Sequence, residues 1–540
     1  MQWWGACHPG STAILCPATK ASRGLALAGG WPGLGLLAVS AIIAAWIAAC
    51  GGFAFYGDAV VFFANAEALF HFDVGDYTFA PGYSLLILLT GYLFTQSLVP
   101  LLWVQAIFAA LTPWLAFRMF LAFNRLAAVA AAAMCLLSLT PFLFENMFYH
   151  DGTFIFCGLL CGSFAAAFFS TGKGRYVYLS LASAVFAYWA QAAMVGFLVA
   201  YVGAFTAYAM SNRGQWKHVA LAIGIVVALT GAEAAWEERV LAVKGQERGE
   251  EGRQLFYHEY LRGVPIVPFD GPAFTALHNA LVDHFTDHPL AGERDQLVSL
   301  TSKLGGSYEA LFEPWEQHPE AFVDRMFARP IRPYYELMYR MLDPPDGVPD
   351  KVFLRASVEY LYRHPLAVMQ YWWRNLADFV WGPGLVCKGD RSFPDCLRFT
   401  PTGFLPAQPD EVVQMIPPDM MPEKARVFLS ERQGSQGPLM RFAAGWWSIV
   451  YGDLRPVLLA LPAIGWLASF RGPRGLSWTL GAFLAAYVST MLVYSLLADA
   501  VFRYQAVGVA MLSFVAGQGL WSIVVFASQV GRLRAADARG

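Results

Sequence analysis

A carboxylate directly after the first long apolar run is the strongest candidate for chemistry in the sequence. Asp58 follows the pair Tyr56-Gly57, and the run from Ala59 to Phe72 places apolar and polar residues at helical spacing. A short helix of this kind would lie along a bilayer surface, with Asp58 at its N-terminus. A carboxylate held at a membrane–water boundary, with few charges nearby, is a candidate general base. The alternative is that Asp58 only caps the free backbone amides of the helix that follows it.

The same segment carries three more carboxylates, Glu67, Asp73 and Asp76. Asp73 and Asp76 could bind a divalent cation such as Mg²⁺ or Mn²⁺, because carboxylate oxygens are the ligands that these ions prefer. The alternative for both is a solvated loop. The sequence therefore predicts no definite metal site, but it leaves a divalent cation open as a cofactor.

A second polar group lies between two later apolar runs, at Glu145-Asn146 and His150-Asp151. Ionisable groups at the end of a membrane span often have a function, and the alternative is a loop that is merely solvated. Gln191 lies in a long uncharged run and either faces an outer cavity or is a hydrogen-bonded turn residue. The candidates for binding an acceptor or supporting the base are Glu145, His150, Asp151, Asp76 and Gln191.

An arginine opens the last apolar run, in the sequence Asp499-Ala500-Val501-Phe502-Arg503-Tyr504. By the orientation derived below, Arg503 lies at the outer end of its span, where arginine is disfavoured, so we expect it to have a partner. That partner is either Asp499 or a phosphate group, for which a planar guanidinium is well suited.

The elements that must position these residues are membrane spans. Of the 540 residues, 57% are hydrophobic and only 14% are charged, whereas a soluble protein carries about 25% charged residues. The apolar runs are continuous rather than alternating, which indicates helices and not a barrel. We find no Walker motif, dinucleotide fingerprint, serine elbow or zinc-protease helix. The sequence therefore argues against a nucleotide-driven machine, and no nucleic-acid partner is expected.

The sequence predicts an all-α polytopic protein with about ten transmembrane helices. The run 176–210 holds no charged residue and is too long for one span, so it should form two, turning near Tyr188 to Gln191. The other runs are 33–53, 100–117, 126–144, 153–171, 219–236, 456–470, 477–498 and 505–530.

Basic residues at alternate ends of these runs set the orientation. The positive-inside rule places those ends, and both termini, in the cytoplasm, and it turns the acidic ends outward. The assignment is consistent only if 81–95 does not cross, so Gly82 to Phe94 should be an interfacial or re-entrant helix. The basic residues are Lys20, Arg23, Arg118, Arg125, Lys173, Arg175, Arg213, Lys217, Arg471, Arg474, Arg532 and Arg534.

This orientation divides the chain into three parts. Residues 1–240 form an N-terminal transmembrane module whose first outer loop, 54–98, carries the catalytic candidate. Residues 241–440 form a large outer loop domain of mixed charge, and 441–540 form a C-terminal transmembrane module. Within the outer domain, Cys387 and Cys396 flank a turn and are a disulfide candidate in an oxidising periplasm. Tyr360 to Trp381 should be an amphipathic helix suited to the interface.

The ordered set of these features resembles a known family. A first span is followed by Gly57-Asp58, a short amphipathic helix, Ala80-Pro81-Gly82-Tyr83-Ser84-Leu85-Leu86, and a span that ends at Arg118-Met119-Phe120. This order is similar to the polyprenyl-phosphate-dependent glycosyltransferases of the GT-C fold, which include protein O-mannosyltransferases and the bacterial aminoarabinose transferase of lipid A. Two departures stand out: a single acid, Asp58, replaces the usual acidic pair, and Gln191 stands where the family often has a basic residue.

The resemblance implies an inverting glycosyltransferase in a bacterial inner membrane, with its site in the periplasm. Asp58 would activate an acceptor hydroxyl for attack on a sugar carried by a polyprenyl phosphate. Arg503, Tyr504 and Tyr83 are then the candidates for binding the donor and its phosphate. The acceptor is a lipid, a glycan or a protein, and the bilayer is the other partner.

Two readings from other classes stay open. A transporter or flippase of lipid-linked or small substrates would also be polytopic and could use intramembrane carboxylates. It should show repeated halves with broken helices, which the sequence lacks. A non-catalytic scaffold with a GT-C-like fold is kept open by the single acid after Gly57.

Overall fold

The computed structural model describes most of the chain, apart from the residues before Gly30 and a series of internal segments. For most of the described residues it also describes the side chain. The described residues are 30–50, 59–71, 81–139, 141–142, 148, 150–191, 194–244, 251–258, 260, 269–303, 307–329, 333–334, 337, 347–381, 421–433, 446, 454–497 and 502–537. Within these ranges the regular secondary structure is helical throughout, as the sequence predicts.

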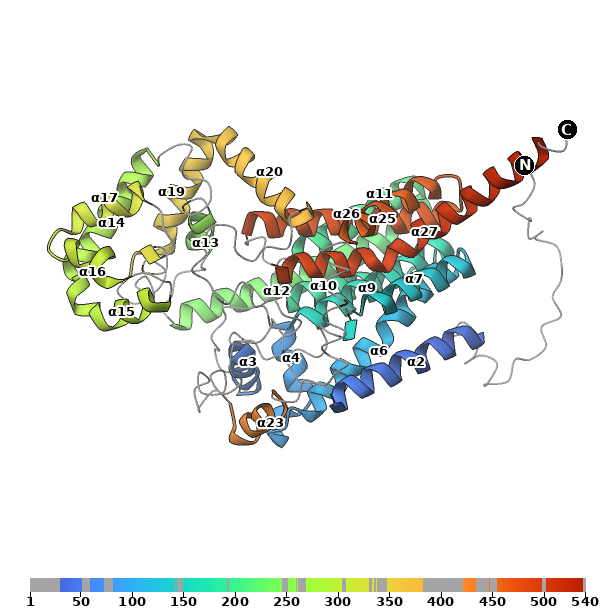
Figure 1. Cartoon of the computed structure of the whole chain (residues 1–540), viewed down its shortest axis with the longest axis horizontal. Helices are drawn as coiled ribbons and strands as arrows, with labels where there is room; N and C mark the ends of the chain where they lie inside the picture. The colour runs from blue at the N-terminus through green and yellow to red at the C-terminus, as the bar shows by residue number, and fades with distance from the viewer. Residues whose placement is uncertain are drawn as a thin grey trace.

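A bundle of long helices forms one half of the molecule (Figure 1). In the described part of the chain, six stretches are long and apolar enough to cross a membrane, which makes the chain a multi-pass membrane protein. Four further helices of the bundle, α7, α10, α11 and α25, have 14 to 17 residues, so the total of ten spans stays a prediction. The bundle helices are α2 (Gly30–Cys50), α6 (Val99–Leu121), α7 (Arg125–Ser138), α9 (His150–Thr171), α10 (Arg175–Ala190), α11 (Val195–Ser211), α12 (Trp216–Lys244), α25 (Arg455–Ser469), α26 (Arg474–Leu497) and α27 (Phe502–Asp537).

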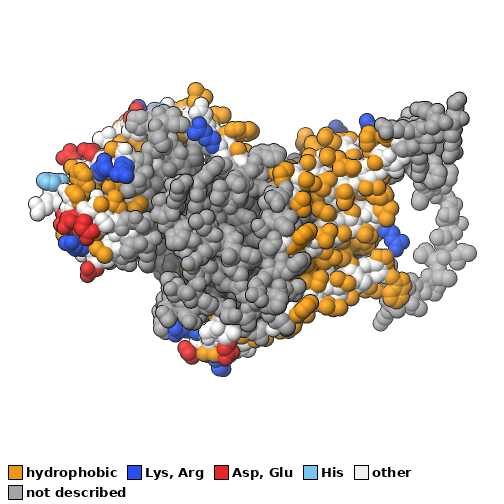
Figure 2. Space-filling model, in the orientation of Figure 1, with side chains coloured by type: hydrophobic (Ala, Val, Ile, Leu, Met, Phe, Trp, Pro, Cys, Tyr) orange, Lys and Arg blue, Asp and Glu red, His pale blue; other side chains and the backbone are white. Residues whose placement is uncertain are grey.

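The centre of the bundle is α9. In the 18-residue apolar stretch of α9, 78% is buried inside the protein, whereas the share is 28% in α2 and 17% in α12. Helix α9 packs against α6, α10 and α26, while α27 packs against α7 and α25. The outer helices α2 and α12 therefore present most of their apolar surface to the lipid, and Figure 2 shows this half as a broad hydrophobic surface.

The predicted hairpin in the run 176–210 is confirmed. Helix α10 ends at Ala190, and Gln191 adopts an extended backbone before α11 begins at Val195. The amide of Gln191 closes the last turn of α10 by donating to Ala187, and Met194 donates to the Gln191 carbonyl. The chain therefore turns between Ala190 and Val195, within a few residues of the turn predicted near Tyr188 to Gln191.

The chain alternates direction so that the basic ends of the bundle helices gather on one side. The start of α2 and the end of α27 both lie at the end of the bundle away from the outer domain (Figure 1). Both described chain ends thus share a side, as predicted, and that this side is cytoplasmic is still a prediction of the positive-inside rule. The basic residues at or beside these helix ends include Arg118, Arg125, Lys173, Arg175, Arg213, Lys217, Arg471 and Arg474.

Short helices replace a span between α2 and α6. Helix α3 (Ala59–His71) coincides with the predicted amphipathic run, and it buries Phe62 and Phe63 while Glu67 is exposed. Helices α4 (Gly82–Leu89) and α5 (Tyr92–Thr95) are separated at Gly91, where φ is 76°. At 8 and 4 residues they are too short to span a bilayer, which fits the prediction that Gly82 to Phe94 does not cross.

The other half of the molecule is an outer domain with its own core. Its core residues run from Phe256 to Tyr360 and are largely aromatic, and they are separate from the core of the bundle. The helices are α13 (Glu251–His258), α14 (Pro272–Asp287), η4 (Leu290–Glu293), α15 (Arg294–Lys303), α16 (Tyr308–Leu311), η5 (Glu313–Trp315), α17 (Pro319–Ala328), α19 (Asp350–Arg363) and α20 (Pro365–Trp381).

Helix α19 organises this domain by capping two earlier helices. The Asp350 carboxylate accepts hydrogen bonds from the Gly252 and Arg253 amides, each at 2.8 Å, in the first turn of α13. The Glu359 carboxylate accepts from the Ala273 and Phe274 amides, at 2.6 and 3.1 Å, in the first turn of α14. Each carboxylate satisfies amides that a helix N-terminus leaves free and lies at the positive end of the helix dipole.

The end of α19 carries a third carboxylate contact. His364 lies 2.9 Å from Asp270 and Arg363 lies 3.4 Å from it, just before α14. The hydrogen bond from His364, with the charge of Arg363, holds the pKa of Asp270 below its ordinary value. The stabilisation from this pair is present above the ordinary carboxyl pKa and is lost as the pH falls through the lowered one.

Replacing Asp350 with alanine should destabilise the outer domain. The change uncaps α13 and removes the partner of Arg253, whose Nε lies 3.5 Å from Asp350 Oδ1 in a buried position. We expect a loss of about 2–4 kcal/mol in unfolding free energy and faster exchange of the Gly252 and Arg253 amides. Hydrogen exchange on the full-length protein measures both. The control Asp283→Ala removes an exposed carboxylate of α14 and should change neither; equal exchange in the two variants would contradict the capping role.

One predicted helix boundary in this domain is wrong. The helix expected over Tyr360 to Trp381 is two helices, because α19 ends at Arg363 and α20 begins at Pro365. Proline has no amide hydrogen and disfavours a helical conformation in the residue before it, so the chain bends at His364.

A later segment returns to the bundle. Helix α23 (Glu423–Gln433) buries Ala425 and Leu429 in the same core as the bundle helices, as does Met421 just before it, and Phe148 contacts Phe428 of α23. In Figure 1 it is drawn at the same end of the bundle as α3 and α4, apart from the outer domain. The residues that follow the outer domain therefore help to cover the end of the bundle where the candidate site lies.

Candidate functional site

Polar side chains, all buried except the half-buried Gln191, lie on helices that meet near the end of the bundle that faces the outer domain. They come from helices that pack on one another: α3 on α4, α4 on α10, and α9 on α6, α10 and α26. We call this group the outer cluster. Its members are Asn65, Tyr83, Ser84, Gln105, His150, Asp151, Thr153, Gln191 and Tyr494.

Aromatic contacts join the first three helices of the outer cluster. The Phe62 ring of α3 lies 5.3 Å from the Tyr83 ring of α4, edge to face at 84°. The same Phe62 ring lies 5.2 Å from the imidazole of His150 at the start of α9. Tyr83 also donates a long hydrogen bond of 3.4 Å to Gln105 Oε1 of α6. The structure thus brings together two predicted site residues, Tyr83 and His150, through a phenylalanine that follows Asp58 closely in the sequence.

His150 and Asp151 form a buried pair in the first turn of α9. The His150 Nε2 atom lies 3.4 Å from Asp151 Oδ1, and the two side chains are 2% and 0% exposed. A carboxylate in the first turn of a helix is stabilised by the helix dipole. The alternative that these residues lie in a solvated loop is therefore wrong, and both are positioned for a role inside the protein.

Several polar groups in and beside the outer cluster have unmet hydrogen-bonding capacity. The Asn65 amide, the Ser84 and Thr153 hydroxyls and the Trp189 indole nitrogen are buried, and in the described part of the chain they find no hydrogen-bond partner. Buried polar groups in native proteins are nearly always hydrogen-bonded, so each exception needs a ligand, a water or a functional reason. Four such groups, on α3, α4, α9 and α10, make this region the candidate site.

The end of α10 links the outer cluster to α26. Gln191 Nε2 donates to the Tyr494 hydroxyl at 3.2 Å, so Gln191 is the hydrogen-bonded turn residue of the sequence-based alternative. A Cβ atom at Gly82 would lie 2.6 Å from the Ala190 nitrogen and the Trp189 carbonyl carbon. Helix α4 therefore touches the backbone of α10, and this close approach requires glycine.

Replacing Tyr494 with phenylalanine tests the link between α10 and α26. The change removes one buried hydrogen bond and keeps the ring, which is 1% exposed. Because side-chain hydrogen bonds inside membrane proteins contribute modestly, we expect a loss of about 0.5–1.5 kcal/mol in unfolding free energy. Equilibrium unfolding in mixed micelles measures it. The effect should be smaller in a Gln191→Leu background, and an undiminished effect there would contradict the pairing.

Several predicted site residues lie outside the described residues. They are Asp58, Asp76 and Glu145, together with the disulfide candidates Cys387 and Cys396. Arg503 and Tyr504 lie in the first turn of α27, which begins at Phe502 as expected, but their side chains are outside the description.

Some members of the outer cluster are absent from the sequence-based candidates. Asn65, Gln105 and Thr153 are polar residues within apolar helices, and Tyr494 ends an apolar run. An isolated amide in a membrane span is itself a functional signal, so Gln105 could have been proposed from the sequence. Ser84 and Tyr494 carry no such signal, because serine and tyrosine are common at span ends.

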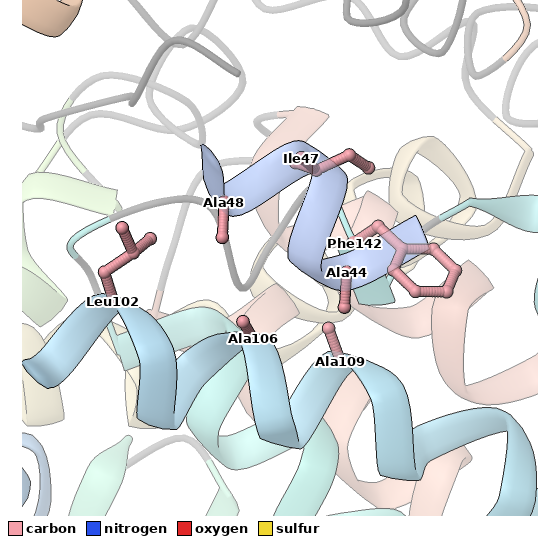
Figure 3. A pocket seen from close by; sticks show the side chains of 7 residues that line it. All are labelled: Ala44, Ile47, Ala48, Leu102, Ala106, Ala109 and Phe142. Carbon is pink, nitrogen blue, oxygen red and sulfur yellow. The ribbon is translucent and has the colours of Figure 1, made fainter. Parts of the chain in front are cut away.

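A small apolar pocket lies between α2 and α6 (Figure 3). Its lining has no charged or amide side chain, so it suits a hydrocarbon group and not a phosphate or a sugar. The lining residues are Ala44, Ile47, Ala48, Leu102, Ala106, Ala109 and Phe142. Among the described residues no three His, Cys, Asp or Glu side chains come together as a group that could hold a metal ion.

Comparisons with known proteins add little to this geometry. No protein-family model and no curated protein matches the sequence. Two solved structures are similar over most of the chain. ArnT from Cupriavidus metallidurans bound to undecaprenyl phosphate has a TM-score of 0.32 and 15% identity, covering 86% of this chain and 77% of that chain. The same protein in the apo state has a TM-score of 0.31 and 14% identity, covering 88% and 78%. Similarity at this level does not establish a shared fold.

Proposed function

We propose that the chain is an integral membrane glycosyltransferase of the GT-C type. It would move a sugar from a polyprenyl-phosphate donor to an acceptor hydroxyl, with inversion at the sugar carbon. The site would face the periplasm of a bacterial inner membrane. The observation that carries the proposal is a set of buried polar groups, at one end of a membrane bundle, that find no hydrogen-bond partner among the described residues.

The location of the outer cluster supports a lipid-borne polar substrate. The cluster lies where the short helices α3 and α4 meet α9 and α10, and α9 and α10 continue into the apolar bundle. A molecule with a long hydrocarbon chain and a sugar head group could place the chain along lipid-facing helices and the head group at the cluster. The apolar pocket between α2 and α6 has a lining of the kind that a hydrocarbon group requires.

The proposed reaction assigns one role to each candidate group. Asp58 takes the proton from the acceptor hydroxyl while the acceptor oxygen attacks the anomeric carbon. The bond from that carbon to the phosphate oxygen breaks, and polyprenyl phosphate leaves with the electron pair. Arg503 neutralises the leaving phosphate, with Tyr504 beside it. The oxocarbenium-like transition state gains further stabilisation from a nearby carboxylate.

Members of the outer cluster would bind the sugar and the acceptor. Asn65, Ser84 and Thr153 supply hydrogen-bonding groups that pair with sugar hydroxyls. Asp151, held by the dipole of α9 and its contact with His150, would accept from an acceptor or a donor hydroxyl. Tyr83 is held by Phe62 and Gln105, so it would position the donor next to the segment that carries Asp58.

A transfer assay tests the reaction class. The wild-type protein in nanodiscs is given a panel of polyprenyl-phosphate sugars with lipid, glycan and protein acceptors, and release of polyprenyl phosphate is measured. Parallel assays with Mg²⁺, Mn²⁺ or EDTA test the divalent cation that Asp73 and Asp76 leave open. Sugar-dependent release supports the proposal. No release with any donor would overturn it in favour of a carrier or a non-catalytic scaffold.

A further inference from the structure

An exposed apolar stripe runs along α20 and the last turn of α19. Leu366, Met369 and Trp373 are 74%, 59% and 69% exposed, at the spacing of one helix face. Tyr362, which is 83% exposed, extends the stripe across the bend at His364. Large apolar side chains gathered on one exposed face mark an interaction surface.

The adjoining face of α20 is fixed to both halves of the molecule. The Trp372 indole donates to Ser495 Oγ of α26 at 2.6 Å. Leu376 packs with the cluster around Tyr494, and Val368 packs on the core of the outer domain. Figure 1 shows α20 as the link between the outer domain and the bundle. These contacts hold the apolar stripe on the outward face of a helix that ends at the membrane bundle.

Among the described residues of α19 and α20, the exposed charges have one sign. The charged residues of α19 and α20 that are described as exposed are Lys351, Arg355, Arg363 and Arg374. Of the acids of α19, Asp350 is buried, and Glu359 has a side chain only 17% exposed and caps α14. Arg363 is paired with Asp270, and Arg355 and Arg374 contribute positive charge at the surface. An apolar stripe with basic neighbours complements an anionic membrane surface.

We propose that α20 docks on the surface of the membrane that holds the bundle, in contact with anionic phospholipids. Leu366, Met369 and Trp373 would enter the boundary between head groups and acyl chains, where tryptophan is favoured. Arg374 and Arg355 would contact lipid phosphates. The occupant is the same bilayer because α20 is joined to the outer end of α26, so its stripe is held close to that surface. The docking holds whether or not the protein transfers a sugar.

Quenching of Trp373 by brominated lipid tests the docking directly. The full-length protein is placed in nanodiscs that contain brominated phosphatidylcholine alone or with brominated phosphatidylglycerol. The tryptophan fluorescence lost to bromine is compared between the wild type and Trp373→Phe. We expect a quenched component that is absent from Trp373→Phe and larger in the anionic discs. The control Trp315→Phe removes a partly buried tryptophan of the outer domain core and should leave the quenched component in place.

A charge-reversal pair tests the head-group contact. Arg355→Glu with Arg374→Glu should reduce Trp373 quenching in anionic discs to its level in neutral discs. Arg294→Glu with Arg329→Glu reverses two exposed charges elsewhere on the outer domain and should have no effect. No Trp373 quenching in either lipid would overturn the docking, and equal quenching in both lipids would overturn the anionic assignment. If each disc holds two copies of the protein and bromine does not quench Trp373, the partner that covers the apolar stripe is a second copy of the chain and not the bilayer.

Discussion

Asp58→Asn should reduce sugar transfer by about 10²- to 10⁴-fold, the usual contribution of a general base. Asparagine keeps the shape of the side chain and can still accept a hydrogen bond from the amides of α3, but it cannot take the proton of the acceptor hydroxyl. The thermal unfolding profile should therefore match that of the wild type. The measurement is the initial rate of polyprenyl phosphate release in nanodiscs at saturating donor.

The control for Asp58→Asn is Glu67→Gln, which changes an exposed carboxylate on α3, the helix that follows Asp58 in the sequence. It changes the local charge by the same amount, and we expect its rate to stay within about threefold of wild type, because a solvated charge is screened. Near-normal transfer by Asp58→Asn would exclude it as the base. The candidates would then be Glu145, Asp76 and the buried Asp151.

Gly82→Ala should displace α4 from the end of α10. The added Cβ would meet backbone atoms of Trp189 and Ala190 at 2.6 to 2.7 Å, which no side-chain rotation can relieve. Overpacking of this kind costs about 1–3 kcal/mol of unfolding free energy. A shift of about 1 Å in a positioning element reduces catalysis by about 10²-fold, so we expect activity to fall further than stability.

Gly203→Ala is the matched control, because a Cβ at Gly203 in α11 meets no atom within 4 Å. Its stability should be unchanged or higher, since alanine favours a helix by about 1 kcal/mol over glycine. Thermal unfolding of both variants is the first measurement, and it does not depend on the proposed reaction. If Gly82→Ala unfolds like Gly203→Ala and retains full activity, the close contact of α4 with α10 is contradicted.

The bundle was predictable because lipid imposes strong constraints on sequence. A continuous apolar run must form a helix, since every backbone polar group needs a partner inside the segment. The uncharged run 176–210 is too long for one span, so a turn near Gln191 was expected. Basic residues at alternate ends of the spans indicated that Gly82 to Phe94 does not cross the membrane. The error over Tyr360 to Trp381 arose because the apolar pattern continues through Pro365 although the helix does not.

The outer cluster was only partly predictable, because burial is a property of packing. The sequence marks His150 and Asp151 as ionisable, but whether they are solvated depends on Phe62 and on the helices that cover α9. Gln191 and Tyr494 are 303 residues apart, and nothing local indicates that they meet. Ser84 becomes informative only when its hydroxyl is seen to be buried without a partner.

The caps supplied by α19 also determine the order in which the outer domain can assemble during synthesis. Asp350 reaches back 98 residues to Gly252, and Glu359 reaches back 86 residues to Ala273. Helices α13 and α14 leave the ribosome first and keep uncapped N-termini until α19 has emerged, so these late, non-local contacts close the domain in one step. Until then its aromatic core is open to chaperones and proteases, and a chain truncated before Asp350 should be degraded rather than stored as a partial fold.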